Sequence, residues 1–390
     1  MNFSFSSVPK IYFGDGALKN AAPEMAAFGK KALIVTGKII TKTGLAKEVS
    51  GLLASLGIDS ALFNDLPGEP TDQMIMAGVD AFKSEQCDFI VGLGGGTPLD
   101  TAKAIAAMAV LPGKLADYKG KEIKGNFAPL VLIPTTAGTG SEVTKYFVFT
   151  NTATEEKLLF KGDALLPKIA VIDYKYTMTA PQSVTMATGM DALCHAVESY
   201  TSRVANPVTD IYCLDAVARI FKCLPRACKD GSDEDARENI SFAAYEAGVA
   251  INGAATTIIH GMSRPIGACF HVPHGISNAM LAVECLTAVM DGCYERFAQL
   301  AVAIGAAEKG REAKDGAEKF IAALEALTKI LGVPTLREYG IDLKKFAELE
   351  DKMAGDSVAS GSPAKCWKIL SKEEQVKIYD LLRNKEAKSV

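Results

Sequence analysis

The sequence is short of tryptophan, histidine and net charge. Its 390 residues include one tryptophan and four histidines, and the formal net charge is only −4. Because Lys and Arg are not in excess, the chain has no general means of neutralising phosphates, which excludes a nonspecific binder of nucleic acid or anionic membranes. Hydrophobic residues make up 48% and charged residues 23%, which excludes a disordered or fibrous chain.

Paired cysteines and long apolar segments are also absent. The nine cysteines form no C-x-x-C pair, and the closest two are Cys223 and Cys228. This usage excludes a disulfide framework and a zinc ribbon, and favours reduced thiols. Residues 1–5 lack the charged and apolar regions of a secretory signal, and the most apolar run, 104–112, is too short to span a bilayer. We therefore expect a cytoplasmic protein.

The first 180 residues alternate between strand and helix patterns. Helical spacing of apolar residues covers 44–56, 71–82 and 98–110, with Thr71 as the expected N-cap of the second helix. Short apolar runs typical of buried strands lie at 31–36, 60–63, 89–93, 130–133 and 169–172. This alternation predicts an α/β domain over residues 1–180, with a mainly parallel sheet covered by helices.

After about Thr179 the strand patterns fade. We place a boundary at residues 179–181 and predict an all-α domain over 181–390, the alternative being one α/β domain with a long helical tail. Helical spacing covers 183–202, 207–221, 233–252, 292–305, 314–331, 343–354 and 372–382.

Two glycine-rich segments follow predicted strands. The first, 92–100 (GLGGGTPLD), opens a helix, where consecutive glycines let a ligand approach the backbone and the helix N-terminus favours an anion such as pyrophosphate. It is not G-x-G-x-x-G, and a tight turn explains it equally well alone. The second, 134–141 (PTTAGTGS), supplies hydroxyl groups that could line phosphates and ribose. Two such junctions together predict a ligand at the carboxyl ends of the sheet.

All four histidines lie between residues 195 and 274. Asp191 and His195 are four apart in a helical pattern, so both can project from one face. His260, His271 and His274 lie within fifteen residues. One Asp with two or three His forms a good donor set for a divalent first-row metal. The alternatives are that Asp191 caps a helix and that the histidines are ordinary core or surface groups.

With these motifs, the chain resembles the iron-containing (group III, metal-dependent) alcohol dehydrogenases, of the superfamily with glycerol dehydrogenase and dehydroquinate synthase. The resemblance covers nearly the whole chain. The motifs that carry it are 94–100 (GGGTPLD, where the family usually has Ser at Thr97), 134–142 (PTTAGTGSE), 189–198 (GMDALCHAVE), His260 and 273–275 (PHG).

The resemblance implies an N-terminal nucleotide-binding α/β domain, a C-terminal helical metal-binding domain, and a cleft between them for metal and nicotinamide. It implies NAD(P) as cofactor, one divalent metal, with Fe²⁺ expected and Zn²⁺ or Mn²⁺ as alternatives, and a homo-oligomer, commonly a dimer. The metal ligands would be Asp191, His195, His260 and His274. The cofactor would be lined by Gly94, Gly95, Gly96, Thr97, Asp100, Thr135, Thr136 and Thr139.

His271 and Arg264 are the candidate catalytic residues. His271 could relay a proton, or could only orient a neighbour. Arg264 stands where many members have another His, and an arginine cannot act as a general base. It could bind a carboxylate, sulfonate or phosphonate, or form a salt bridge with a nearby acid.

A second departure concerns the adenosine ribose. Many members have Asp after the relevant strand, and here that position is Gly37, followed by Lys38. Without the acid a 2′-phosphate is not repelled, and Lys38 could attract it, which favours NADP. The alternative is that Lys38 is a solvated surface charge.

The sequence thus predicts a metal-dependent oxidoreductase that transfers hydride between a nicotinamide cofactor and a short-chain alcohol or aldehyde. An alternative is a reductase for a small anionic aldehyde such as sulfoacetaldehyde or succinic semialdehyde. Two others are a dehydroquinate-synthase-like lyase and a nucleotide-binding protein whose metal site has lapsed.

Overall fold

Six parallel strands form the sheet of the N-terminal part of the chain. They lie in the order β1-β8-β5-β4-β2-β3, and every neighbouring pair is parallel. The mainly parallel sheet expected from the sequence is therefore confirmed. The strands are β1 (Lys10–Phe13), β2 (Lys31–Thr36), β3 (Asp59–Phe63), β4 (Phe89–Gly94), β5 (Leu130–Pro134) and β8 (Ile169–Ile172).

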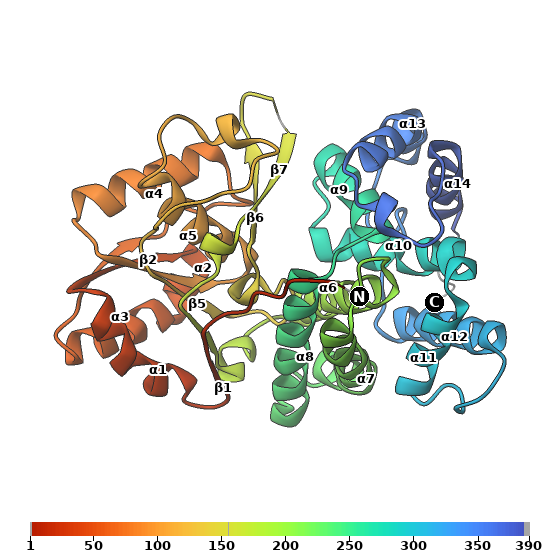
Figure 1. Ribbon diagram of the computed structural model, residues 1–390, viewed down its shortest axis with the longest axis horizontal. Helices are drawn as coiled ribbons and strands as arrows, with labels where there is room; N and C mark the ends of the chain where they lie inside the picture. The colour runs from red at the N-terminus through yellow and green to blue at the C-terminus, as the bar shows by residue number, and fades with distance from the viewer. Residues whose placement is uncertain (1, 155, 386–390) are drawn as a thin grey trace. The chain divides into compact units, whose positions relative to one another are not determined.

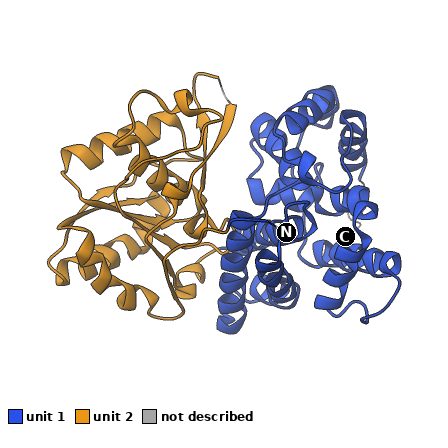
Figure 2. Cartoon of the chain, in the orientation of Figure 1, with its two compact units in different colours: residues 1–4, 181–390 blue, residues 5–180 orange. Residues whose placement is uncertain are grey.

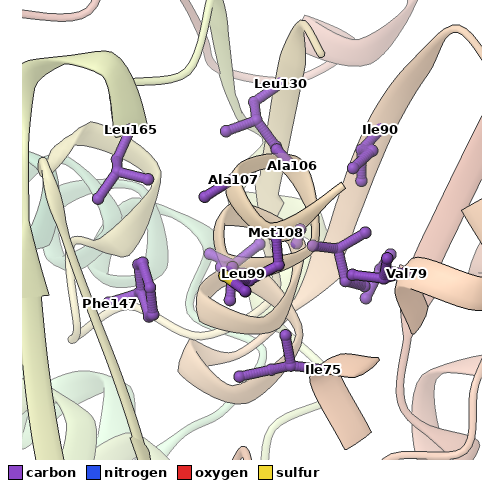
Figure 3. Close-up of a cluster of buried hydrophobic side chains, with 14 of the residues drawn as sticks. Ile75, Val79, Ile90, Leu99, Ala106, Ala107, Met108, Leu130, Phe147 and Leu165 are labelled. Atoms are coloured by element: carbon purple, nitrogen blue, oxygen red, sulfur yellow. The ribbon is translucent and has the colours of Figure 1, made fainter. Parts of the chain in front are cut away.

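Helices cover both faces of this sheet, because its strands are apolar on both sides. Leu33 and Val35 of β2 join one core with α4 and α5, and Figure 3 shows part of this cluster. Ala32 and Ile34 point to the other core, which includes α1 and α3. These helices are α1 (Ala17–Met25), α3 (Leu45–Ser55), α4 (Asp72–Ser84) and α5 (Gly96–Met108).

Three local features refine the sequence prediction. Thr71 caps α4, accepting a hydrogen bond from the Met74 N–H at 3.2 Å, as expected. Helix α5 begins at Gly96, two residues before the predicted start. An antiparallel hairpin, β6 (Tyr146–Asn151) and β7 (Glu156–Lys161), was not predicted. Its phenylalanines stack on one another and pack into the α4–α5 core.

The computed structural model describes residues 2–154 and 156–385 (Figure 1). They divide into two units, one formed by residues 5–180 and the other by residues 181–385 together with residues 2–4 (Figure 2). In the part described after Ala180 the regular elements are helices. They are α6 (Gln182–Thr201), α7 (Pro207–Lys229), α8 (Glu234–Gly253), α9 (Ile258–Phe270), α10 (His274–Val289), α11 (Tyr294–Ala303), α12 (Ala313–Ile330), α13 (Leu343–Ala359) and α14 (Lys372–Arg383).

Helix α6 forms the centre of this helical unit. It contacts α7, α8 and α10, and it is buried without interruption from Gly189 to Thr201. Helix α7 extends eight residues beyond its predicted end, and α9 and α10 were not predicted. None of the described helices is long and apolar enough to cross a membrane. All nine cysteines are unpaired.

Candidate metal and cofactor sites

Helix α6 presents two of the expected metal ligands on one face. Asp191 and His195 are 2% and 5% exposed. The Nε2 atom of His195 lies 3.8 Å from Oδ1 of Asp191. The spacing of four residues therefore places an oxygen and a nitrogen donor together inside the helical unit, as the sequence predicted.

Helices α9 and α10 bring the other two expected ligands to the same carboxylate. The Nε2 atoms of His260 and His274 lie 3.6 and 3.7 Å from Oδ1 of Asp191. Ligand atoms of Asp191, His195 and His260 all lie within 4.8 Å of one another. Four tetrahedral ligands at about 2.1 Å from one cation are about 3.4 Å apart, so this arrangement fits a divalent metal.

The charges at this cluster also suit a cation. Burial alone raises the pKa of the Asp191 carboxyl, but the three surrounding imidazoles hold this pKa well below its usual range. Burial lowers the pKa of His260, yet the carboxylates of Glu198 and Asp191 outweigh it and raise that pKa to about 9. A buried negative centre thus attracts positive charge, whether proton or metal.

Glu198 is a functional residue to which the sequence assigned no role. It lies on α6, seven residues after Asp191, and is fully buried. One of its oxygens is hydrogen-bonded to Nδ1 of His260. The other accepts the Ile259 N–H at 2.6 Å and the Thr257 hydroxyl at 3.0 Å. This carboxylate holds the ring so that Nε2 faces the ligand cluster, which is how metal-binding histidines are usually oriented.

The ligand cluster is enclosed on most sides. The side chains of Asp191, His195 and His260 are 3–7% exposed, whereas that of His274 is 36% exposed. The side at His274 is therefore where a small molecule can reach the cluster. Asn278, which the sequence also did not indicate, lies against Asp191 with its Nδ2 atom at 2.7 Å from Oδ1.

The two candidate catalytic residues lie at different points of α9. His271 ends the helix in a left-handed conformation (φ 55°) and is exposed. Arg264 lies one turn after His260, and its Nη1 donates to the Ser362 hydroxyl at 3.2 Å. Burial lowers the pKa of Arg264. No carboxylate lies within ion-pair distance of it among residues 2–154 and 156–385, so the expected alternative of a salt bridge is not found there.

The two glycine-rich segments lie side by side at the carboxyl ends of β4 and β5. The Thr135 N–H donates to the Gly94 carbonyl at 2.9 Å. A Cβ at Gly95 would lie 3.4 Å from the Thr136 hydroxyl, and one at Gly96 would lie 3.0 Å from the Thr139 methyl. Gly95 and Gly96 therefore allow the two segments to pack closely, next to the N-terminus of α5, where an anion is favoured.

Asp100 contacts the second segment rather than open space. Its two oxygens accept the Ser141 hydroxyl at 2.6 Å and the Val148 N–H at 2.9 Å. Lys103, one turn along α5, donates to the carbonyls of Thr144 and Tyr146 at 2.7 and 2.8 Å. Burial raises the pKa of Asp100, and lowers that of Lys103 to about 8. These two charges tie α5 to the chain that follows the second segment.

Gly37 follows β2, as the sequence indicated, and Lys38 is the first residue of the short helix α2 (Lys38–Thr43). A Cβ at Gly37 would meet nothing within 4 Å, so a side chain fits there. Lys38 forms an exposed ion pair with Asp65, with Nζ and Oδ1 2.9 Å apart. Asp65 thus places an acid beside Lys38, which the sequence around Gly37 does not reveal.

Comparisons with known proteins match the whole architecture. Residues 9–174 match the model of the iron-containing alcohol dehydrogenases, and residues 185–381 match the C-terminal model of the same family. The NAD-dependent methanol dehydrogenase of Bacillus methanolicus is 37% identical over 362 residues, which are 92% of this chain and 95% of that protein.

Solved structures of similar enzymes share this fold over nearly the whole chain. The structure of a 1,3-propanediol oxidoreductase superposes with a TM-score of 0.94 at 34% identity, over 98% of this chain and all of that one. A sulfoacetaldehyde reductase from Bifidobacterium kashiwanohense, solved with NAD⁺, has a TM-score of 0.89 at 26% identity, over 99% and 100% of the two chains.

The paired α/β and helical units with a cluster of one carboxylate and three imidazoles define an alcohol oxidoreductase of the metal-dependent type. The chain belongs to the iron-containing alcohol dehydrogenase family.

Proposed function

We propose that this enzyme interconverts a short-chain alcohol and its aldehyde with NAD(P), using one divalent metal held by Asp191, His195, His260 and His274. The observation that supports this most is the convergence of three imidazole nitrogens within 3.6–3.8 Å of one carboxylate oxygen. When bound, the metal supplies Lewis-acid polarisation of the substrate oxygen.

The protein's own residues set the conditions for this chemistry. Asp191 stays ionised because its pKa is depressed, so it supplies a negative donor at neutral pH. Glu198 holds the His260 ring through Nδ1 and leaves Nε2 to face the cluster. The partly exposed side at His274 admits the substrate, while the other three ligands keep the site closed to bulk water.

We propose His271 as the proton relay. It is exposed and lies three residues before His274, at the end of the helix that carries His260. An imidazole can accept a proton on one ring nitrogen and donate one from the other. His271→Asn tests this, because asparagine tolerates the left-handed backbone but has no imidazole ring. A relay predicts a loss of turnover that added imidazole restores.

For the cofactor, we propose that Gly94, Gly95, Gly96 and Thr97 bind the pyrophosphate at the start of α5. The neighbouring hydroxyls of Thr135, Thr136 and Thr139 then line the rest of the dinucleotide. Asp100 acts by fixing the second segment, since both of its oxygens are already engaged by Ser141 and Val148. NADP(H) is accepted as well as NAD(H), because Gly37 leaves room where an acid would repel a 2′-phosphate.

Three further properties are part of the proposal. The metal is Fe²⁺, in keeping with the family to which the chain belongs, and Zn²⁺ or Mn²⁺ suit the same donors. The enzyme works in the cytoplasm, where its nine unpaired thiols remain reduced. It assembles as a homodimer.

The experiment that tests the function is a substrate panel. The purified chain is loaded with Fe²⁺ or Zn²⁺, and oxidation of NADH and NADPH is followed with short aldehydes. The proposal predicts turnover that requires metal, with short neutral aldehydes among the substrates. A loaded enzyme that turns over none of them would contradict it.

Arg264 favours a second candidate substrate class, small anionic aldehydes. Arg264 is partly buried one turn beyond His260, and its described hydrogen-bond partner is the Ser362 hydroxyl. The charge of Glu198 acts on this guanidinium, but no carboxylate of the described residues lies within ion-pair distance of it. A cation without a direct acidic partner is expected to bind an anion, and a carboxylate, sulfonate or phosphonate matches the guanidinium geometry. The similar sulfoacetaldehyde reductase acts on such an aldehyde.

The test compares kcat/KM for an anionic and a neutral aldehyde of equal size. Arg264→Ala removes the cation, and Ser362→Ala, which removes only the partner hydroxyl, is the control. Loss of the charge-assisted contact costs the anion about 2 kcal/mol, or about 30-fold, and spares the neutral substrate. Equal losses for both substrates would leave Arg264 a structural residue.

A further inference from the structure

Asn278 contacts three of the four proposed metal ligands at once. It lies on α10, one turn after His274, and is fully buried. Its Nδ2 atom is 2.7 Å from Oδ1 of Asp191, 3.2 Å from Nε2 of His274 and 3.3 Å from Nε2 of His260. These are the atoms that would bind the cation. The amide therefore caps one face of the ligand cluster.

The orientation of this amide is set by the ligand atoms alone. Its Oδ1 atom is buried and has no hydrogen-bond partner in the described part of the chain. Leaving a buried carbonyl oxygen unsatisfied is unfavourable, so contacts on the N–H side must compensate for it. The amide N–H donates to the Asp191 carboxylate, which is its shortest contact, and its nitrogen also lies 3.2 and 3.3 Å from the Nε2 atoms of His274 and His260.

We propose that Asn278 is a positioning residue of the metal centre, which holds Asp191, His260 and His274 together before the metal arrives. The amide N–H holds the Asp191 carboxylate oxygen at the point where the three imidazole nitrogens converge. This inference rests on the proposed function, because it assumes that the cluster binds metal.

The same geometry explains how the amide and the cation coexist. A carboxylate oxygen accepts in more than one direction, so Asp191 Oδ1 can keep its hydrogen bond from Asn278 while it binds a cation. An imidazole Nε2 would bind a cation through its one lone pair, so His260 and His274 would then give up their longer contacts with the amide. Asn278 then remains a hydrogen-bond donor to a ligand and is not itself a ligand.

Cobalt(II) binding tests the proposal on the full-length chain. The protein is stripped with a chelator, and the Kd for Co²⁺ is measured by competition with a chromophoric chelator. Asn278→Leu replaces the amide by an apolar group of similar size. Gln375→Leu is the matched control, because Gln375 on α14 is also a fully buried amide, with one weak bond to the Leu370 carbonyl at 3.4 Å. Asn278→Ala covers the case in which leucine prevents folding.

Asn278→Leu should raise the Kd for Co²⁺ by about 10- to 100-fold, as expected for a residue that orients a metal ligand. Gln375→Leu should change it less than threefold. The visible Co²⁺ absorption at saturation should keep its intensity, since the number of ligands is unchanged. A folded Asn278 variant with unchanged Kd would overturn the proposal, as would a change in absorption that indicates a lost ligand. If the unsubstituted chain binds no Co²⁺, the proposed metal centre itself fails.

Discussion

Gly275, at the start of α10, packs directly against the backbone of Ala187 on α6. A Cβ at position 275 would lie 2.3 Å from the Ala187 carbonyl oxygen. This close approach sets the distance between α6, which carries Asp191, and α10, which carries His274. The glycine is therefore part of how the fold brings a carboxylate and an imidazole within 3.7 Å.

Gly275→Ala should consequently weaken metal binding without touching a ligand. The first turn of α10 must move to admit the methyl group, and overpacking of this kind costs about 1–3 kcal/mol. We expect metal affinity to fall by about 10-fold or more, as measured by competition with a chelator. Gly355→Ala in α13 is the control, since its Cβ would meet only Lys372 at 3.8 Å. Similar metal affinities for Gly275→Ala and Gly355→Ala would show that the packing of Gly275 does not affect the metal centre.

Replacing Glu198 tests how His260 is held. Glu198→Gln keeps the size of the side chain but removes its charge and one acceptor. Because the neutral amide orients the imidazole less strongly, metal affinity should fall about 10- to 100-fold. Thr257→Val removes the hydroxyl that donates to Glu198 and also contacts Cys366, and it should have a smaller effect. If Thr257→Val lowered metal affinity as much as Glu198→Gln, the contact between Glu198 and His260 would not be what determines that affinity.

The preference for NADH or NADPH should shift in opposite directions when an acid is added near Lys38 and when one is removed. Gly37→Asp places a carboxylate where it can accept the ribose hydroxyl and repel a 2′-phosphate, so it should favour NADH. Asp65→Asn frees Lys38 from its ion pair, so it should favour NADPH. The measurement is the ratio of kcat/KM for the two reduced cofactors. An enzyme that cannot use NADPH before any substitution would refute the assignment of this pocket.

Stability should fall with rising pH because of Glu246 on α8. Burial, and to a lesser extent the neighbouring Asp215, raise the pKa of Glu246 to about 9. The folded chain therefore holds this proton more tightly than the unfolded chain between about pH 4.5 and 9. The contribution of Glu246 to the free energy of unfolding therefore declines as pH rises through that window, by up to about 1.4 kcal/mol per pH unit.

Glu246→Gln cannot titrate and should flatten this decline, so its melting temperature should fall less between pH 6 and pH 9. Glu238→Gln on the same helix makes the same change of charge at an exposed position, and is the control. Parallel curves for the native chain and Glu246→Gln would show that Glu246 is not held protonated.

The elements that the sequence predicted well are those with regular burial. Strand β2 is buried on both faces and shows as an uninterrupted apolar run, and α6 and α12 keep helical spacing for several turns. The helices that carry His260 and His274 were missed. Helix α9 contains Pro265, which ordinarily breaks a helix, although its apolar residues do gather on one face. Helix α10 is apolar around most of its surface and therefore has no clear periodic face.

The four expected ligands could be picked out from the sequence because Asp and His are common metal donors and because they lie in motifs of the family. Glu198 and Asn278 could not be found in this way. A glutamate in a helix and an asparagine in an apolar segment have many ordinary uses. Their roles exist only because α6, α9 and α10 pack together and place both side chains against the ligands. The ion pair of Lys38 with Asp65 likewise joins residues 27 apart in sequence, so no local pattern reveals it.

The most direct test of the account is the metal content of the native chain and of His274→Ala after identical loading with Fe²⁺. The four-ligand centre predicts one metal per native chain, and a variant that loses most of its metal and its turnover together, because a ligand has been removed. A folded His274→Ala variant that kept one tightly bound metal and the native rate would contradict the account.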